Sequence, residues 1–279
     1  MKHCVYLLAV ILVTASCNNK KNTTKETVVI TTIDSVKHTV DTSLQVTAKP
    51  DAVAIILARK QVPILCYHHI NDQKPGDYRV PPVNFAAQMQ ALADSGYNTI
   101  LPDELYNYLA YGKALPAKPI MLTFDDTDEE QFTVGNTEMK KHHFKGVFFI
   151  MNISIGRPRY MNKEQLKQLS DEGNVVAAHT WDHHMVTKYT AADWVKQLDE
   201  AKQKLITITG KPVVYFAYPF GLWNKPATVE LPLHGIKMAF QLSDKMDAEQ
   251  PLYTVRRMLV PGTWSTNSMF KFMKGTFHL

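Results

Sequence analysis

Short apolar runs alternate along this chain with longer stretches in which apolar residues recur every three or four positions. The short runs are typical of buried strands, and the longer stretches are typical of amphipathic helices. Such alternation predicts an α/β fold on a parallel sheet, either open or closed into a barrel. The predicted strands are Val62–Tyr67, Tyr97–Leu101, Ile120–Phe124, Lys145–Ile150, Val175–Ala178, Val213–Ala217 and Lys237–Phe240, with a further extended piece at Tyr253–Val260.

Some of the predicted helices carry clear end signals. Asn162 is placed to cap one helix, and Thr190 with Asp193 approximates a capping box that opens another, which runs to Gly210. Pro232 disturbs the helical pattern near the end of the chain, because proline removes a backbone donor and clashes with the preceding turn. These signals divide the second half of the chain into short strand–helix units.

The N-terminus has the pattern of an export signal. Lys2 precedes the apolar segment Val5–Val13, which is too short to span a bilayer, and small residues then lead to Cys17. The segment resembles a bacterial lipobox, although Thr14 stands where such boxes usually carry Leu. That resemblance implies cleavage before Cys17 and a lipid on its thiol.

The chain is therefore expected to have three parts. Residues 1–16 form a lipoprotein signal peptide, residues 17–50 form an extended tether rich in Thr, Lys and Val, and residues 51–279 form one folded domain. We expect an exported monomer, anchored by lipid in the cell envelope, at the periplasm or the outer membrane.

Composition narrows the functional classes. The formal charge of +5 is spread along 279 residues without a basic block, so nucleic-acid binding has little support. Of the three cysteines, only Cys66 lies in the predicted domain, where an internal disulfide is impossible. Cys66 sits in an apolar run and is expected to be a small buried residue.

Candidate chemistry follows two of the predicted strands. Asp125 and Asp126 come directly after Ile120–Phe124, and His179 and His183 follow the next strand but one. Two imidazoles four residues apart, together with a carboxylate, are typical of a divalent cation site that keeps positions open for water. A neighbouring carboxylate could then deprotonate that water, which suits hydrolysis of an amide or ester. The plainer alternative is an acidic turn after a strand.

Three segments resemble the first motifs of the polysaccharide deacetylases, also called the NodB-homology domain or carbohydrate esterase family 4. They are Thr123-Phe124-Asp125-Asp126, His179-Thr180-x-x-His183 and Tyr218-Pro219-Phe220-Gly221, and the resemblance covers about Gln61 to Val260. The family implies a distorted (β/α)7-type barrel, a divalent metal and the removal of acetyl groups from carbohydrate. The metal is usually zinc, although two His and one Asp also suit nickel, cobalt or iron.

The resemblance also implies residue roles. Asp125 is the expected general base. The expected metal ligands are Asp126, His179 and His183. The backbone N–H of Tyr218 is expected to stabilise the oxyanion that forms as water attacks.

Two residues that the family usually carries are missing from their usual places, and each has a candidate replacement elsewhere in the chain. Ala217 stands where many members carry an Arg that orients the base, and Arg257 is expected to supply that charge instead. The usual late acid has no convincing match. However, Leu65–Ile70 resembles the Tyr-His motif of the circularly permuted branch that acts on poly-N-acetylglucosamine. In that branch an early His is the general acid, which favours His68 over its neighbour His69.

Aromatic residues near the motifs are candidates for a wall that holds a sugar ring, namely Trp181, Phe220 and Trp223, although each could equally pack at the barrel rim. We therefore expect a metal-dependent deacetylase of an N-acetylglucosamine-containing polysaccharide, with a poly-N-acetylglucosamine-like substrate favoured. Alternatives are deacetylation of peptidoglycan, chitin or acetylated xylan, or a non-catalytic carbohydrate-binding lipoprotein on the same scaffold.

Overall fold

The computed structural model describes residues 49–242 and 245–279. The predicted signal peptide and almost all of the predicted tether lie outside the described residues. The strands are β1 (Ile64–Tyr67), β2 (His69–Ile70), β3 (Arg79–Val80), β4 (Asn98–Thr99), β5 (Pro119–Asp125), β6 (Gly146–Ile150), β7 (Val175–Ala178), β8 (Tyr215–Ala217), β9 (Met238–Phe240) and β10 (Met258–Leu259).

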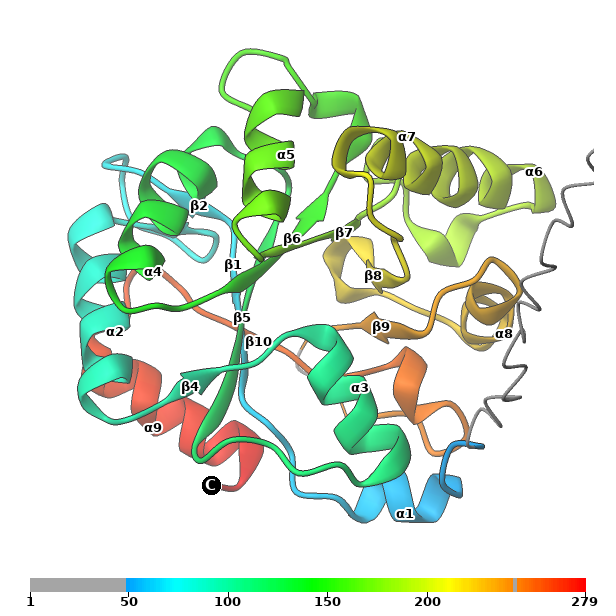
Figure 1. Ribbon diagram of the computed structural model, residues 1–279, viewed down its shortest axis with the longest axis horizontal. Coiled ribbons are helices and arrows are strands. Elements are labelled where there is room, and N and C mark those ends of the chain that lie inside the picture. The colour runs from blue at the N-terminus through cyan, green and yellow to red at the C-terminus, as the bar shows by residue number, and fades with distance from the viewer. Residues whose placement is uncertain (1–48, 243–244) are drawn as a thin grey trace, which may run out of the picture. The chain divides into compact units, whose positions relative to one another are not determined.

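The α-helices surround the sheet in Figure 1. They are α1 (Val53–Ala58), α2 (Pro82–Asp94), α3 (Pro102–Tyr111), α4 (Thr137–Lys141), α5 (Lys163–Asp171), α6 (Ala191–Trp194), α7 (Glu200–Thr209), α8 (Lys225–Leu233) and α9 (Thr266–Phe277). Short 3₁₀ or π segments are η1 (Gln131–Asn136), η2 (Asn152–Ser154), η3 (Val186–Lys188), η4 (Val195–Asp199), η5 (Pro219–Gly221) and η6 (Pro251–Tyr253). No described helix is both long and apolar enough to cross a membrane.

A curled parallel sheet forms the centre of the domain. Among the described residues, its strands follow the order β10-β1-β5-β6-β7-β8-β9, and β4 adds to one end of β5. Every neighbouring pair in this order is parallel. A parallel bridge between Phe240 and Val255 joins β9, at one edge of the sheet, to the segment before β10, at the other edge. The arrangement is a distorted (β/α) barrel, which confirms the predicted fold class.

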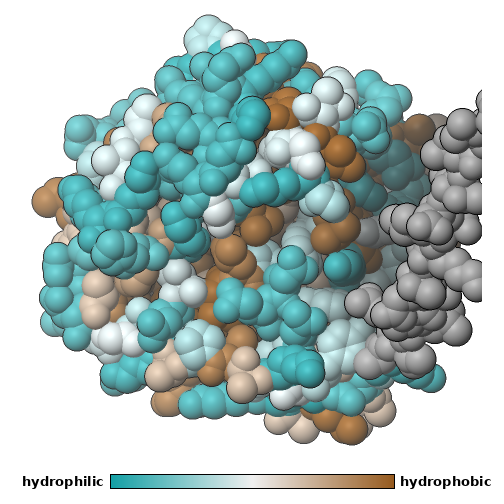
Figure 2. All heavy atoms as spheres, viewed as in Figure 1, coloured by the Kyte–Doolittle hydropathy of each residue, from teal (hydrophilic) through white to brown (hydrophobic). Residues whose placement is uncertain are grey.

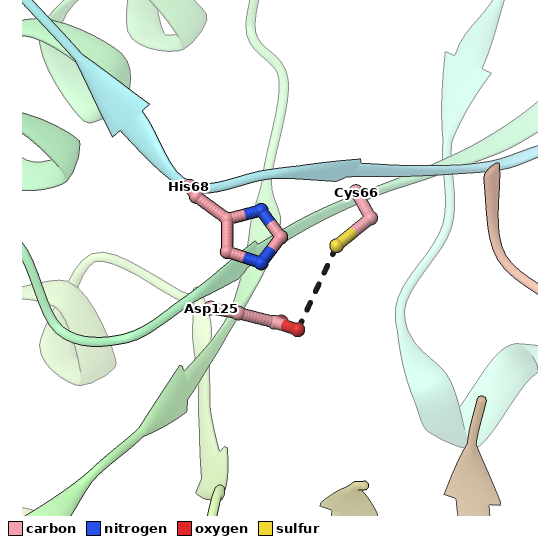
Figure 3. Close-up of side chains that lie close together, drawn as sticks. All are labelled: Cys66, His68 and Asp125. Carbon is pink, nitrogen blue, oxygen red and sulfur yellow. Dashed lines mark hydrogen bonds between the residues drawn. The ribbon is translucent and has the colours of Figure 1, made fainter. Parts of the chain in front are cut away.

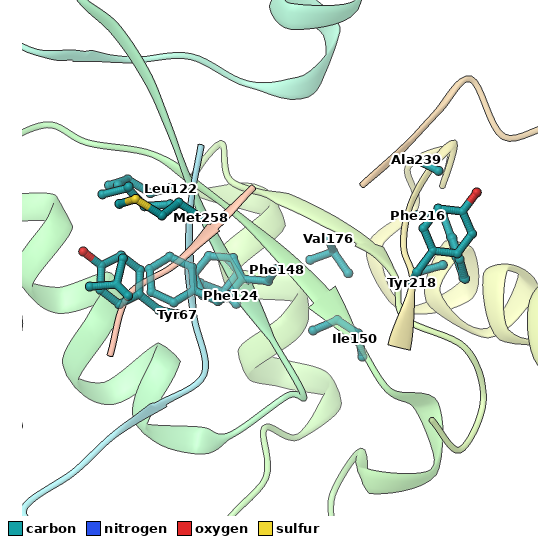
Figure 4. Packing of buried hydrophobic residues seen from close by; sticks show 14 of the residues in the cluster. Tyr67, Leu122, Phe124, Phe148, Ile150, Val176, Phe216, Tyr218, Ala239 and Met258 are labelled. Atoms are coloured by element: carbon teal, nitrogen blue, oxygen red, sulfur yellow. The ribbon is translucent and has the colours of Figure 1, made fainter. Parts of the chain in front are cut away.

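Strand alternation separates two apolar cores. On β1 and β5, Leu65, Tyr67, Leu122 and Phe124 point outward and pack under the helices, as the stacked rings in Figure 4 show. The intervening residues belong to the other face and fill the barrel interior together with residues of α1 and α3. Because successive side chains of a strand point to opposite faces, one strand can serve both cores.

The interior changes character toward the carboxyl ends of the strands. Cys66, Thr123, Asp125 and Arg257 are all buried there, in place of the apolar residues that fill the opposite end. The outer surface is ordinary by comparison: hydrophilic side chains cover most of the face in Figure 2, and hydrophobic ones reach it in scattered places, near the centre, at the upper right and along the lower edge. Buried polar groups therefore concentrate at one end of the barrel.

Most of the sequence-based assignments of elements are confirmed. Each predicted strand is present, although several are shorter than their apolar runs. The Asn162 side chain accepts a hydrogen bond from the Gln165 N–H, as its predicted capping role requires. Pro232 lies inside α8 rather than ending it. Helices α1, α3 and α9 and the small β2–β3 sheet were not predicted.

Candidate active site

The predicted base, acid and metal-binding residues meet in one cavity of about 270 Å³ at the carboxyl ends of the barrel strands, whereas the predicted catalytic residues Tyr218 and Arg257 do not line it. Larger cavities beside α1 contain none of them. Among the described residues, the site cavity is lined by His68, His69, Tyr78, Asp125, Asp126, His179, His183, Phe220 and Leu242.

The pairing of β1 with β5 places two of these residues side by side. Tyr67 pairs with Phe124, so the next step of the register brings His68 opposite Asp125 on the interior face. The buried amide of Gln131 connects the two strand ends, because its Nε2 donates to the backbone carbonyls of both His68 (2.9 Å) and Asp125. Sequence reasoning did not single out Gln131, since its partners are backbone atoms of distant strands.

Asp126, His179 and His183 present three ligand atoms to one point. The Oδ1 of Asp126 lies 3.4 Å from the His179 Nε2 and 3.3 Å from the His183 Nε2, and the two nitrogens are 3.2 Å apart. Ligands about 2.0–2.2 Å from a tetrahedral cation lie roughly 3.3–3.6 Å from one another. The buried Asp126 Oδ1 also accepts no hydrogen bond from the described residues. These residues therefore fit a divalent cation.

Hydrogen bonds hold the two histidines in the ligating orientation. The Nδ1 of His179 lies 2.8 Å from the Ala217 carbonyl and donates to it, which leaves the Nε2 lone pair facing Asp126. The backbone N–H of His183 donates to the Thr180 hydroxyl at 2.8 Å. The tight turn between the ligands is thus fixed by the threonine between them.

The backbone around the cavity is strained. Asp126, Thr127, Thr180, His183 and Phe220 all have positive φ angles, between 60° and 79°, although none is a glycine. Such conformations cost free energy and persist where surrounding contacts hold them. For Thr127 those contacts include its hydroxyl, which accepts the N–H of the residue after β6 at 2.8 Å.

Arg257 pairs with the predicted base. Its Nη1 and Nη2 each lie 2.7 Å from one oxygen of Asp125, and neither side chain is more than 2% exposed. Further bonds from the guanidinium to the Thr123 hydroxyl and the Gln241 carbonyl fix its orientation. The charge that Ala217 cannot provide therefore reaches the base from the segment before β10.

The charges in the cavity set the protonation of its carboxyl groups. Burial opposes the ionisation of Asp125, but the Arg257 charge outweighs it and holds the pKa of this carboxyl below its usual range. Burial likewise opposes the ionisation of Asp126, whose pKa the neighbouring histidines lower. Burial lowers the pKa of the His68 imidazole. Both aspartates are consequently ionised at neutral pH.

The predicted role of the Tyr218 N–H requires correction. This N–H donates to the Phe240 carbonyl at 3.0 Å as part of the β8–β9 region, and the Tyr218 ring packs in the outer core. It is therefore not available to an oxyanion. By contrast, the Phe220 N–H donates to no backbone carbonyl of the described residues, and the Phe220 ring lies 4.4 Å from that of His183 at the cavity wall.

Of the predicted aromatic wall, only Phe220 lines the cavity. The Trp181 ring is covered by the Lys196 ammonium, 3.7 Å from its centroid, and the Trp223 indole donates to Gln241 while its ring packs on the outer core. Tyr78, which the sequence pattern did not indicate, lines the cavity instead. It is 54% exposed, and its ring meets the His68 ring edge-on at 5.0 Å.

The two candidate acids differ in their surroundings. His68 is buried against Asp125, and its Nδ1 has no hydrogen-bond partner among the described residues. His69 also lines the cavity, but its Nδ1 lies 3.0 Å from the buried carboxylate of Asp128. The nearby Asp128 carboxylate raises the pKa of His69. His68 is the one that adjoins the predicted base.

Comparison with known proteins agrees with this geometry. Residues 112–239 match the family model for polysaccharide deacetylase. The chain carries a polysaccharide deacetylase domain. It belongs with enzymes that hydrolyse amide bonds of acetylated polysaccharides or peptidoglycan and that generally depend on a metal. The matched segment includes Asp125, His183 and Phe220, whereas His68 and Arg257 lie outside it.

Individual relatives support the same assignment. The chain is 27% identical to the putative polysaccharide deacetylase YxkH of Bacillus subtilis over 204 residues, which are 72% of each protein. It is 29% identical to the peptidoglycan-N-acetylglucosamine deacetylase PgdA of Listeria monocytogenes over 133 residues, 47% of this chain and 28% of that protein. Among solved structures it resembles IcaB from Ammonifex degensii, with a TM-score of 0.66, 25% identity and coverage of 78% and 97%.

Proposed function

We propose that this enzyme removes N-acetyl groups from an N-acetylglucosamine polysaccharide of the poly-N-acetylglucosamine type. The observation that carries the proposal is the buried pair of Asp125 with Arg257, beside His68 and the Asp126–His179–His183 ligand set. The early His68 is the feature for which the sequence resembles the branch acting on that polymer.

Asp125 is the base in the proposed reaction. It accepts a proton from the attacking water. Arg257 keeps the Asp125 carboxylate ionised and oriented before substrate binds. A divalent cation held by Asp126, His179 and His183 would polarise the acetamide carbonyl and lower the pKa of the water. The strained loops described above hold these ligands in place.

His68 and Phe220 act on the two substrate atoms whose charge changes in the reaction, the leaving nitrogen and the carbonyl oxygen. His68, next to Asp125, protonates the departing glucosamine nitrogen so that it leaves as an amine. The Phe220 N–H replaces the Tyr218 N–H as the proposed donor to the carbonyl oxygen as it gains negative charge. The rings of Phe220 and Tyr78, both exposed at the cavity, offer faces for a sugar ring.

The test is acetate release from N-acetylglucosamine oligomers and polymer, with and without added divalent metal. We expect metal-dependent release that Asp125→Asn abolishes while metal binding is retained. The exposed Asp171 lies outside the cavity, so Asp171→Asn is the matched control. Loss of metal from Asp125→Asn would contradict the division between base and ligands, and absence of release under every metal would contradict the proposed substrate.

Peptidoglycan is the second candidate substrate, because the chain is similar to a peptidoglycan-N-acetylglucosamine deacetylase over 133 residues. Parallel assays on purified peptidoglycan separate the two. A faster rate on peptidoglycan than on the N-acetylglucosamine polymer would assign the enzyme to the cell wall.

We also propose zinc as the cation and a lipid on Cys17 as the membrane anchor of an exported enzyme. The donor set of two imidazoles and a carboxylate supports zinc. Metal analysis of the purified protein tests the first proposal. Fractionation of cells that express the full chain or Cys17→Ala tests the second, with the variant expected to leave the membrane fraction.

A further inference from the structure

We propose that a basic patch beside the catalytic cavity binds carboxylate groups along the glycan strand, so that the substrate is an N-acetylglucosamine polymer that also carries acidic groups. The patch consists of two lysines on the Trp181 ring, Lys196 and Lys204, and of two further cations close to Lys204, namely Arg157 and Lys163. Lys163 begins α5 and Lys204 lies on α7, and these two helices lie side by side in Figure 1. The inference rests on the proposed function, because the ligand is the substrate of that site.

Trp181 holds two of the ammonium groups in place. The Nζ of Lys196 lies 3.7 Å from the centroid of the Trp181 ring, and the Nζ of Lys204 lies 5.0 Å from it. An aromatic ring attracts a cation over its face. The Lys204 Nζ also donates to the Asn152 carbonyl at 3.0 Å. An anion would therefore meet ammonium groups that are already ordered, which reduces the entropy lost on binding.

The patch is short of negative charge. Among the described residues, no carboxylate forms an ion pair with Arg157, Lys163 or Lys204. Lys196 does pair with Glu200, at 2.6 Å. Burial lowers the pKa of Lys204, and the charges of the three other cations lower it further. Like charges held close together repel one another, and an anion that binds among them offsets this cost. The missing counter-charge points to an anionic ligand.

The patch lies at the catalytic end of the barrel. Asp125 and His68 stand at the carboxyl ends of β5 and β1 (Figure 3), and Trp181 stands in the loop after the nearby strand β7. Trp181 lies between the ligands His179 and His183 in sequence, so its Cα is at most about 7.6 Å from each of theirs. Its carbonyl accepts a backbone N–H from the loop after β6 at 2.7 Å. A glycan strand longer than the cavity can therefore reach the patch while its acetamide group stays beside Asp125.

Carboxylates are the anions that suit both the patch and the proposed substrate. Lysine and arginine side chains bind carboxylates through charge-assisted hydrogen bonds. In a glycan such groups occur as sugar acids or as acidic substituents of the ring, repeated along the strand. A neutral N-acetylglucosamine homopolymer offers none of them, so the patch favours an acidic glycan over a neutral one.

The test compares two soluble N-acetylglucosamine polymers that differ in charge, neutral glycol chitin and anionic carboxymethyl chitin. Binding is measured by affinity gel electrophoresis with the full-length protein carrying Asp125→Asn, so that turnover does not alter the polymers. We expect Lys163→Gln combined with Lys204→Gln to weaken binding of carboxymethyl chitin about 3–10-fold, as for the loss of two exposed ion pairs. Binding of glycol chitin should not change. Raising sodium chloride to roughly 0.5 M should have the same selective effect, because salt screens exposed charges.

Controls separate recognition of charge from a structural role. Lys271→Gln, which changes an exposed lysine of α9, is the matched control and should alter binding of neither polymer. Urea unfolding of Lys163→Gln should show no loss of stability, because the change relieves repulsion of Lys204. Lys163→Gln alone replaces the double variant if circular dichroism shows that the latter is unfolded, and a loss of about 2–3-fold is then expected.

Three outcomes would overturn the proposal: equal losses for the two polymers, no loss for either, or no binding of carboxymethyl chitin by the protein with an intact patch. The binding assay does not depend on turnover. Failure of acetate release from glycol chitin would therefore count against the proposed function and leave a charge-dependent binding result intact.

Discussion

Replacing Arg257 by Met is the most informative single change, because it leaves the Asp125 carboxylate buried without its partner. Both side chains are no more than 2% exposed, and two hydrogen bonds of 2.7 Å are lost. Breaking one side of a buried ion pair costs about 3–5 kcal/mol at neutral pH. Asp125 can escape this cost only by taking up a proton.

The cost fixes the expected pH dependence. Without the Arg257 charge nothing outweighs the burial of Asp125, so the pKa of this carboxyl rises above its usual range. In wild type the folded pKa is lowered, so this group stabilises the fold above its unfolded pKa and loses that effect as pH falls. In Arg257→Met the folded pKa is raised, so stability falls as pH rises through it. The destabilisation should be large at pH 8 and small near pH 4.

Urea unfolding of the metal-free proteins at the two pH values measures this difference. The matched control is Asp125→Asn combined with Arg257→Met, which has no unpaired charge and should show a destabilisation independent of pH. Deacetylation at pH 7 should fall at least about 10-fold in Arg257→Met, because much of the base is protonated and the side chain that orients it is gone. An equal loss of stability at both pH values would refute the reasoning, since it would mean that Asp125 stays ionised without Arg257.

Three other changes test the parts that support the site. Gln131→Leu removes the amide that donates to the backbone carbonyls of His68 and Asp125. The kcat for acetate release should then fall about 10–100-fold with little change in KM. An equal effect on kcat and KM would contradict a positioning role for Gln131. Thr127→Val leaves the buried N–H after β6 without an acceptor and should lower the free energy of unfolding by about 1–3 kcal/mol, whereas Thr127→Ser should preserve it in the same urea assay. Glu172→Gln should cost roughly 1 kcal/mol at pH 7. Although burial raises the pKa of Glu172, hydrogen bonds from Lys140 and neighbouring amides lower it to about 2, so the gap in melting temperature between wild type and variant should close as pH falls from 4.5 to 2. A constant gap would assign the loss to packing.

Much of this protein could be predicted from local sequence. Strand positions follow from apolar runs, and the pairs Asp125–Asp126 and His179–His183 stand just beyond two of those runs. In a parallel barrel the carboxyl ends of the strands share one face, so these residues had to meet. The choice of Asp126 rather than Asp125 as the ligand came from the resemblance to the deacetylase motifs, and the three ligand atoms do converge on one point.

The rest depended on contacts between distant parts of the chain. Arg257 reaches Asp125 across 132 residues, and because no periodicity indicates such a pair, it was expected only from the comparison with the family motifs. The pairing of β8 with β9 decides whether Tyr218 or Phe220 offers a free N–H. The Tyr218 N–H donates to the Phe240 carbonyl beside this pair, whereas the Phe220 N–H, in the turn that follows, donates to no backbone carbonyl of the described residues. In the same way Trp181 is covered by Lys196 of η4, and Tyr78 is brought to the cavity by a loop without any pattern. Sequence alone therefore determined which residues carry the chemistry at the strand ends, and only the tertiary structure decided which neighbours complete it.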